Sequence, residues 1–281
     1  FGTAGCNLAC KFCQNWDISK SREMDRLMDR ASPETLARAA LKLGSRSVAF
    51  TYNDPVIFHE YAVDVAQACR EVGVRTVAVT AGYVMPEPRE EFYGHMDAAN
   101  IDLKGFSEGF YRKLAAGRLE PVLDTLRYVC NETRVWVELT TLLIPGWNDS
   151  EEELQDMTAW VVEELGPSVP MHFTAFHPAW RLLDAASTPA ATLLKAREIA
   201  LSNGVRYAYV GNVRDKSASS TYCHSCGVLL IGREGYTLSD WNLTPEARCS
   251  RCGTELAGVL EAQPGSWGGR RQPVHLANWR H

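Results

Sequence analysis

Several features that would define common protein classes are missing from this chain of 281 residues. It has no run of about 18 apolar residues, so no membrane-spanning helix is expected. Its start shows no charged segment followed by an apolar run, so no secretory signal peptide is predicted. A formal net charge of only -5 argues against a general nucleic-acid-binding surface. Neither a Ser–His–Asp set nor a glycine loop that holds phosphates is evident. The length of the chain suits one large domain plus a small one.

The nine cysteines are grouped as they are in metal sites. They form one triplet, two C-x2-C pairs and two single residues, Cys69 and Cys130. Because nothing indicates secretion, disulfides are not expected, and the grouping favours a reducing compartment. We therefore predict a cytoplasmic protein with metal sites.

The triplet of Cys6, Cys10 and Cys13 stands near the start of the chain, with the spacing C-x3-C-x2-C. A four-iron cluster usually takes four cysteine ligands, so three thiolates leave one iron open to a small molecule. Zinc with a histidine as fourth ligand is an alternative, but the first histidine is His59. A fourth thiolate from one of the single cysteines is another, although both are predicted on a helix or at the end of one. The spacing favours an iron–sulfur cluster with an open position.

Apolar runs alternate with amphipathic stretches from residue 31 to about residue 209, which predicts strands followed by helices. Repeated strand–helix units imply a parallel sheet. We predict an α/β fold, a partial parallel (β/α)6-type TIM-like barrel, with residues 1–4 as the stub of a first strand. Active sites of such barrels lie at the carboxyl ends of the strands, where the triplet would stand. The predicted strands are 47–51, 75–80, 99–104, 135–143, 169–176 and 205–210, and the predicted helices are 33–43, 56–72, 87–95, 108–115, 121–129, 150–165 and 190–203.

Alternation along one predicted strand places two charged side chains inside the barrel. Asp102 and Lys104 share one face of the strand, whereas Ile101 and Leu103 share the other and are expected to pack on helices. A buried structural ion pair is the alternative interpretation. Because buried pairs stabilise proteins poorly and are enriched at functional sites, we favour a site.

The stretch Cys6-Asn-Leu-Ala-Cys10-Lys-Phe-Cys13, with an aromatic residue directly before the third cysteine, resembles the radical S-adenosylmethionine (SAM) superfamily. The resemblance implies a partial or full parallel barrel and a [4Fe-4S] cluster whose open iron binds the amino and carboxylate groups of SAM. It also implies that an electron, supplied by a donor such as flavodoxin or ferredoxin, cleaves SAM to methionine and a 5′-deoxyadenosyl radical. The radical abstracts hydrogen from a substrate, and a barrel interior that excludes water suits this chemistry.

More narrowly, the chain is similar to the activating enzymes of the pyruvate formate-lyase activase type, and it looks like the AmmeMemoRadiSam radical SAM proteins over nearly its whole length. Members carry an additional N-terminal segment, so the chain is expected to be a fragment. The resemblance implies a protein substrate, or association with Memo-type and AMMECR-type proteins. A radical SAM enzyme that modifies a small molecule or RNA is the alternative.

The resemblance also implies which residues of this chain bind SAM. Phe12 matches the aromatic residue near the adenine, and Thr51-Tyr-Asn-Asp-Pro55 stands where the superfamily often has the Gly-Gly-Glu that holds the SAM amino group. Asp102-Leu-Lys104 matches the activase motif near the methionyl or ribose end, and His177 aligns with a histidine near the ribose. A structural histidine is the alternative for His177. The residues predicted to bind SAM are Phe12, Asn53, Asp54, Asp102, Lys104 and His177.

Two cysteine pairs near the end of the chain predict a second metal site, with Cys223, Cys226, Cys249 and Cys252 as ligands. The spacer of 22 residues slightly exceeds the usual zinc-ribbon range of about 15–20. A glycine follows each pair and can take the left-handed conformation that closes a knuckle around a metal. Closed four-cysteine sites are structural, so Zn²⁺ is predicted. A single iron or an auxiliary iron–sulfur cluster is the alternative.

These patterns divide the chain into a radical SAM partial barrel (1–216), a four-cysteine ribbon (217–258) and an extended C-terminal tail (259–281). A function of a different class follows from the ribbon and from Arg270 and Arg271 in the tail. In that alternative the barrel is a scaffold, and the ribbon binds protein or nucleic acid. The acidic net charge makes nucleic acid the less favoured partner.

Overall fold

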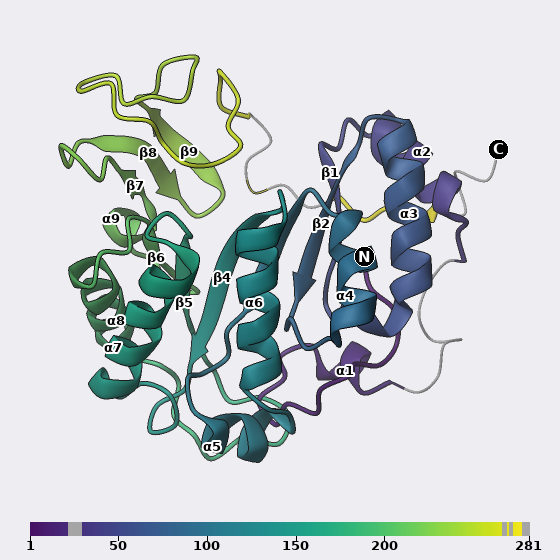
Figure 1. Cartoon of the computed structure of the whole chain (residues 1–281), viewed down its shortest axis with the longest axis horizontal. Helices are drawn as coiled ribbons and strands as arrows, with labels where there is room; N and C mark the ends of the chain where they lie inside the picture. Colours follow the sequence, from purple (N-terminus) through teal and green to yellow (C-terminus); the bar gives the residue numbers. More distant parts are fainter. Residues whose placement is uncertain (22–29, 266–268, 270–271, 277–281) are drawn as a thin grey trace. The chain divides into compact units, whose positions relative to one another are not determined.

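The computed structural model describes residues 1–21, 30–265, 269 and 272–276 (Figure 1). Contacts divide the chain into two compact units. The first comprises Phe1–Glu138, Pro178–Ala185 and Pro273–His281, and the second comprises Leu139–His177 and Ala186–Gln272. In the described part of the chain, every helix is too short or too polar to span a membrane. Arg270 and Arg271 lie outside the described residues.

Six strands form one sheet, in the same order as in the sequence. The pairs β1–β2, β2–β3, β4–β5 and β5–β6 are parallel, as the strand–helix alternation predicts. The predicted α/β class with a parallel sheet, consistent with a partial barrel, is confirmed. The strands are β1 (Ser47–Phe50), β2 (Arg75–Thr80), β3 (Ala98–Asp102), β4 (Trp136–Leu143), β5 (Met171–Ala175) and β6 (Ala208–Gly211).

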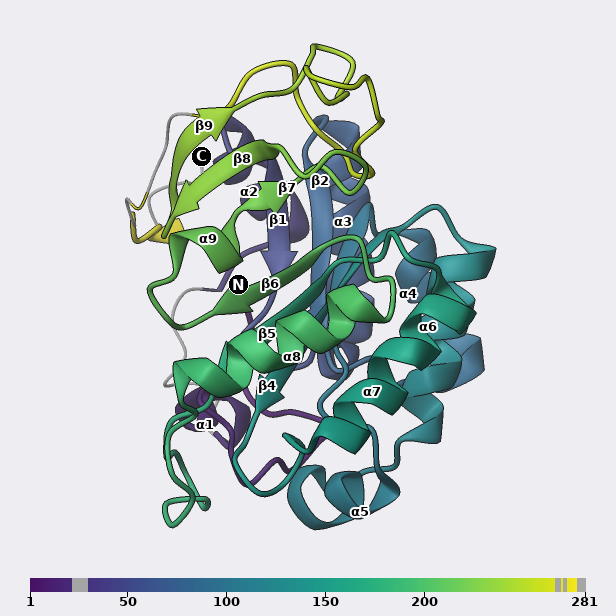
Figure 2. The same cartoon turned by 90° about the vertical axis from the view of Figure 1, so that its left-hand side faces the viewer.

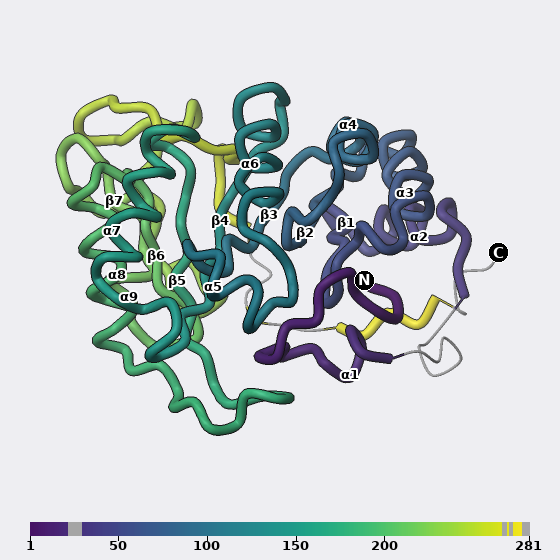
Figure 3. Tube along the Cα trace, turned by 60° about the horizontal axis from the view of Figure 1, so that its bottom comes forward, coloured from purple at the N-terminus to yellow at the C-terminus, as the bar shows by residue number. Residues whose placement is uncertain are grey.

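Helices α2, α3 and α4 lie on one side of β1 and β2, and the start of the chain with α1 lies on the other side (Figure 3). In Figure 1, α1 lies below the arrowheads of β1 and β2, at their carboxyl ends. Ser32 caps the first long helix by accepting a hydrogen bond from the Thr35 amide at 3.3 Å, as predicted. The helical segments are α1 (Trp16–Ser19), α2 (Pro33–Lys42), η2 (Pro55–Phe58), α3 (His59–Glu71), α4 (Pro86–Gly94), α5 (Glu108–Phe110), the π-helical η3 (Tyr111–Ala115) and α6 (Glu120–Glu132).

The predicted alternation along β3 is confirmed. Ile101 and Leu103 are fully buried, whereas Asp102 and Lys104 are partly exposed. The strand itself ends at Asp102, two residues earlier than predicted. Lys104 therefore lies in the loop that leaves the carboxyl end of β3.

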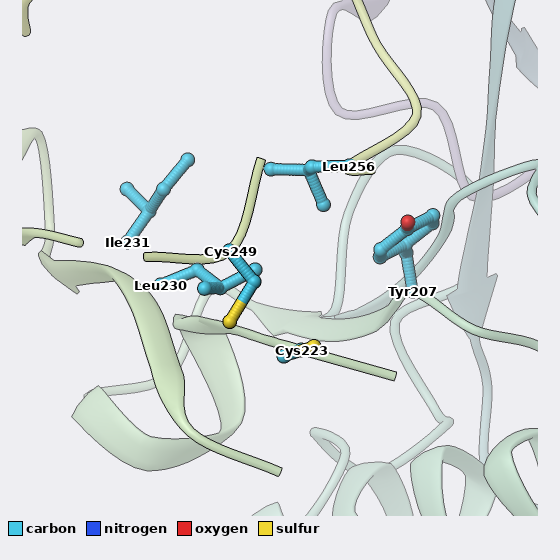
Figure 4. Close-up of a cluster of buried hydrophobic side chains, with 6 residues drawn as sticks. All are labelled: Tyr207, Cys223, Leu230, Ile231, Cys249 and Leu256. Atoms are coloured by element: carbon cyan, nitrogen blue, oxygen red, sulfur yellow. The ribbon is translucent and has the colours of Figure 1, made fainter. Parts of the chain in front are cut away.

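The second unit carries β5 and β6 together with an antiparallel three-stranded sheet that was not predicted (Figure 2). A small core joins this sheet to Tyr207, just before β6, and it includes the sulfur-bearing side chains of Cys223 and Cys249 (Figure 4). The Tyr207 hydroxyl accepts a hydrogen bond from the Ala257 amide at 3.2 Å. The remaining elements are α7 (Glu151–Trp160), the π-helical η4 (Val161–Leu165), α8 (Ala190–Ser202), α9 (Lys216–Ser219), β7 (Thr221–Tyr222), β8 (Leu229–Glu234) and β9 (Thr237–Trp241).

Candidate functional site

The first residues of the chain run beside the end of β1. The Phe1 amino group donates to the Ala49 carbonyl at 2.7 Å, and the Thr51 amide donates to the Phe1 carbonyl at 2.7 Å. These two bonds on alternate residues follow the ladder of a parallel strand pair. A Cβ atom at Gly2 would clash with the Thr51 carbonyl, so glycine permits this close approach. The predicted strand stub is thus held next to β1 and leads directly into the cysteine triplet.

Backbone bonds fix the triplet loop on both sides of Cys10. The Ala9 amide donates to the Ala115 carbonyl at 3.1 Å, and the Lys11 amide donates to the Leu114 carbonyl at 2.8 Å. The loop therefore rests on the end of η3. Because these are main-chain contacts, they set the path of the loop independently of its side chains.

The Lys20 side chain and the backbone of Arg181 also support the triplet loop. The Lys20 ammonium donates to the Leu8 carbonyl at 2.8 Å. The Arg181 amide donates to the Lys11 carbonyl at 2.9 Å. Arg181 belongs to the segment Pro178–Ala185, which the sequence did not associate with the triplet. No local pattern marks that contact, because about 170 residues separate its two sides.

The three cysteines of the loop are free thiols, with Cys10 buried and Cys6 and Cys13 half-buried. Burial raises the pKa of Cys10 to about 11, although the charge of Lys104 acts in the opposite direction. Because a metal-bound cysteine is a thiolate, iron must displace the Cys10 proton. Cys13 Sγ lies 3.1 Å from the Ser19 hydroxyl.

The triplet offers the kind of donor set that a four-iron cluster takes. In such a cluster each cysteine binds a different iron, so three cysteines can supply three of the four protein ligands. Three thiols on one loop are also the donor chemistry that such clusters take. The residues present therefore fit a [4Fe-4S] cluster.

Asn53 and Asp54 are adjacent and both buried, at the loop that follows β1. The Asn53 side chain accepts from the Thr3 amide at 3.2 Å, and it donates to the Gly5 carbonyl at 2.8 Å and to the Thr3 hydroxyl at 3.3 Å. This predicted SAM-binding residue thus contacts the chain just before Cys6.

The Asp54 carboxylate is likewise used inside the protein. It accepts hydrogen bonds from the Thr80 hydroxyl at 3.0 Å, from the Ala81 amide at 2.8 Å and from the Val56 amide at 3.0 Å. Burial raises the pKa of Asp54, and these hydrogen bonds act in the opposite direction. The carboxylate ties the end of β1 to the end of β2, and it caps η2.

Asp102 and Lys104 form an ion pair, with Lys104 Nζ 2.7 Å from Asp102 Oδ2, which is the contact that the alternative interpretation expects. The Asp102 side chain remains 35% exposed and that of Lys104 is 15% exposed. Burial lowers the pKa of Lys104, but the charges of Asp102 and Cys10 raise it by more, so the net change is upward. The same ammonium group acts electrostatically on Asp54 and Tyr111. The structure therefore brings Cys10, Asp54 and Lys104 into one electrostatic neighbourhood at the carboxyl ends of β1–β3.

Aromatic rings flank the loop. Phe12 is buried, with its ring centroid 5.7 Å from that of Phe110. Trp16 is exposed and stacks on Trp180 at 4.9 Å between centroids. His177 follows β5 in the second unit and is exposed. The SAM contacts of Phe12 and His177 stay predictions.

The four predicted cysteines of the second unit form a compact group that could hold a metal ion, with all four sulfur atoms within 4.8 Å of one another. Cys223 Sγ lies 3.6 Å from Cys252 Sγ, and Cys226 Sγ lies 3.7 Å from Cys249 Sγ. Four sulfur atoms at about 2.3 Å from one tetrahedral ion would be about 3.8 Å apart, so the spacing suits a single ion.

A glycine closes each of the two knuckles. Gly227 and Gly253 have φ angles of 72° and 75°. Their amides donate to the carbonyls of Cys223 and Cys249, each at 2.9 Å. The left-handed conformation predicted for these glycines is therefore present.

The sequence profile of the Radical SAM superfamily matches residues 2–158, which include the triplet, Asn53, Asp54 and the Asp102–Lys104 pair. The chain belongs to the radical SAM superfamily. The predicted membership of this superfamily and the predicted radical SAM type of enzyme are thus confirmed.

Individual relatives resemble this chain over more than half of its length. It is 37% identical over 257 residues to an uncharacterized protein of Methanocaldococcus jannaschii, covering 91% of this chain and 76% of that one. It is 24% identical over 163 residues to a pyruvate formate-lyase-activating enzyme of Clostridium pasteurianum, covering 54% of this chain and 64% of that one.

A solved structure supports the fold. A domain of a pyruvate-formate lyase-activating enzyme from Bacteroides vulgatus superposes with a TM-score of 0.52 at 18% identity, covering 59% of this chain and 99% of that domain. At this identity the likeness concerns the fold alone, and it agrees with a partial radical SAM barrel.

Proposed function

We propose that this protein cleaves SAM reductively and uses the resulting radical to abstract hydrogen from a substrate. Cys6, Cys10 and Cys13 would hold a [4Fe-4S] cluster whose fourth iron is open to SAM. When bound, the cluster supplies the electron that splits SAM into methionine and a 5′-deoxyadenosyl radical. The observation that carries the proposal is the triplet loop itself, which presents three free thiols on one loop that Asn53 ties to the end of β1.

Within the chain, the Asp102–Lys104 pair is the best candidate to bind the methionyl end of SAM. That end carries one positive and one negative group, and the pair offers the complementary charges from two partly exposed side chains. Asn53 and Asp54 already use their side chains inside the protein. We therefore assign the charged contacts with SAM to Asp102 and Lys104.

The substrate is proposed to be a protein, as in an activating enzyme. Several relatives bear the name of activating enzymes, including those of pyruvate formate-lyase and 4-hydroxyphenylacetate decarboxylase. The reductant is proposed to be a small electron-transfer protein such as flavodoxin or ferredoxin. Association with Memo-type and AMMECR-type proteins stays a prediction.

Product release from SAM tests the proposed function. After anaerobic reconstitution with iron and sulfide, the reduced protein is expected to convert SAM to 5′-deoxyadenosine and methionine. The Cys10→Ala variant should release neither above background, because it lacks one of three ligands. Equal amounts of 5′-deoxyadenosine from both proteins would disprove the assignment.

For the second metal site we propose a structural Zn²⁺. The sulfur spacing matches one tetrahedral ion, and two of the four ligands are buried in the small core of the second unit. A closed four-sulfur site leaves no position for a substrate, so the ion would stabilise the fold.

A further inference from the structure

Asn53 stands where the superfamily places a SAM-binding segment, yet its side chain serves the protein itself. Both N–H groups of its amide are used, one toward Gly5 and one toward Thr3. Its side-chain oxygen accepts a hydrogen bond from the Thr3 amide. Asn53 as a whole is 7% exposed. Three hydrogen bonds thus join the end of β1 to the residues that precede the triplet.

Gly5, the residue before the first cysteine, is fixed through both of its backbone polar groups. Its carbonyl accepts from Asn53 at 2.8 Å, and its amide donates to the Ile18 carbonyl at 3.1 Å. Its φ angle of 93° lies in the region that favours glycine. The direction in which the chain reaches Cys6 is therefore set by Asn53 and Ile18.

A second asparagine fixes the other side of Cys6. The side-chain amide of Asn7 donates to the Tyr83 carbonyl, beyond the end of β2, at 2.8 Å. Cys6 thus lies between two residues that are each tied to the end of a different strand. Cys10, by contrast, is flanked by main-chain bonds to the end of η3.

We infer that Asn53 is a positioning residue for the first cysteine ligand, and that it acts on retention of the cluster rather than on binding of SAM. This inference rests on the proposed function, since it concerns the same cluster. Loss of the Asn53 side-chain amide would leave the Gly5 carbonyl without this hydrogen bond. The backbone that leads to Cys6 would then be held less firmly. A ligand that is held less firmly recaptures its iron more slowly, so the cluster should be lost more easily.

Iron release from the reconstituted protein tests the inference. Asn53→Ala and the near-isosteric Asn53→Asp are compared with the parent in an iron chelator, with zinc content and SAM affinity measured on the same samples. Asn53→Asp can still accept from Thr3 but places an oxygen against the Gly5 carbonyl. Both variants are expected to release iron about tenfold faster, with zinc content and SAM affinity unchanged.

Asn203→Ala is the matched control. Asn203 also donates through its amide to two groups, the Gln155 carbonyl at 3.1 Å and the Thr158 hydroxyl at 2.8 Å, but it belongs to the second unit. Its loss should leave iron release at the parent rate. Faster release in this control, equal to that of the Asn53 variants, would overturn the inference because the effect would be general.

The remaining outcomes separate the positioning role from a SAM-binding role. Weakened SAM affinity with parent-like iron release in Asn53→Asp would overturn the inference and restore the role implied by the family. If the parent takes up no iron, the proposed function fails and the inference fails with it. If the parent takes up iron and the Asn53 variants release it no faster, only the inference fails.

Discussion

Tyr52 occupies a left-handed conformation, with φ 74°, between β1 and the buried pair that follows it. Normal strand alternation would send Asn53 and Asp54 to opposite faces. The turn at Tyr52 breaks this alternation. Asn53 and Asp54 are therefore both buried, whereas Tyr52 itself is 54% exposed. The sequence placed Asn53 and Asp54 at the site, but it could not reveal this turn, because a tyrosine there gives no signal of a positive φ.

Replacement of Tyr52 tests the energetic cost of its conformation. A side chain in the left-handed region costs about 1–2 kcal/mol relative to glycine. Tyr52→Gly and Tyr52→Ala both remove an exposed ring, and only glycine relieves the backbone. We expect the glycine variant to be more stable than the alanine variant by about 1 kcal/mol, measured as a thermal midpoint higher by about 2–4 °C. Equal midpoints would show that the conformation costs nothing.

Lys104 offers a second test at a single residue. Lys104→Met keeps the aliphatic stem and removes the charge that faces Asp102 and Cys10. A hydrogen bond to a charged group contributes about 1.5–3 kcal/mol, so SAM should bind at least about tenfold more weakly. Equilibrium dialysis against labelled SAM measures this, with iron content expected to stay at the parent level.

The control for Lys104 is Lys113→Met, on the exposed side of η3. It removes the same charge away from the ion pair and should leave SAM affinity unchanged. A Lys104→Met variant that binds SAM as tightly as this control would exclude Lys104 from the SAM contacts.

Most strands and helices follow from the periodicity of the sequence, whereas the residues at which they begin and end depend on individual hydrogen bonds. β3 ends before Lys104 because the Lys104 amide donates to the Tyr111 hydroxyl at 3.2 Å, outside the strand ladder. The helix expected from residue 56 begins as η2 at Pro55, since Asp54 caps it. The contact with Tyr111 is not visible from the local pattern.

The ribbon strands and the support of the triplet loop were beyond prediction for a related reason. β7, β8 and β9 are short and pack around paired cysteines, so no long alternating run marks them. The segment Pro178–Ala185 belongs to the first unit although its neighbours in sequence belong to the second. Only a contact such as that between Arg181 and Lys11 identifies its place.

The substitution Gly117→Ala tests whether the close approach of the chain after η3 to the triplet loop matters. A Cβ atom there would lie 2.9 Å from Leu8 Cδ2 and 3.5 Å from the Tyr83 ring. Leu8 is 3% exposed and has little room to move, so Gly117→Ala should overpack this contact at a cost of about 1–3 kcal/mol. We expect a lower thermal midpoint and a lower iron content after reconstitution.

Gly109→Ala is the control for that substitution. Gly109 lies in α5, and a Cβ atom there would have no heavy atom within 4 Å. Alanine also favours a helix over glycine, so this variant should be at least as stable as the parent. If Gly117→Ala matched Gly109→Ala in midpoint and iron content, the close approach would not matter to the loop.

At the scale of the whole molecule, the two proposed metal sites draw their ligands from different compact units. The triplet belongs to the first unit, and the four cysteines of the ribbon belong to the second. Two cysteines of the ribbon are part of a small core that includes Leu230 and Leu256. Zinc there would stabilise local packing, whereas iron at the triplet would serve the reaction.

Metal content should therefore respond independently at the two sites. Cys226→Ser is expected to lose zinc, because a closed site with three thiolates binds more weakly, and to lower the thermal midpoint while iron uptake stays at the parent level. Cys10→Ser should lose iron and keep about one zinc per chain. Metal analysis measures the iron content and the zinc content of each variant, with both variants purified and reconstituted side by side. Loss of both metals in either variant would mean that one site depends on the other, and iron at the ribbon in place of zinc would refute the structural assignment while leaving the triplet unaffected.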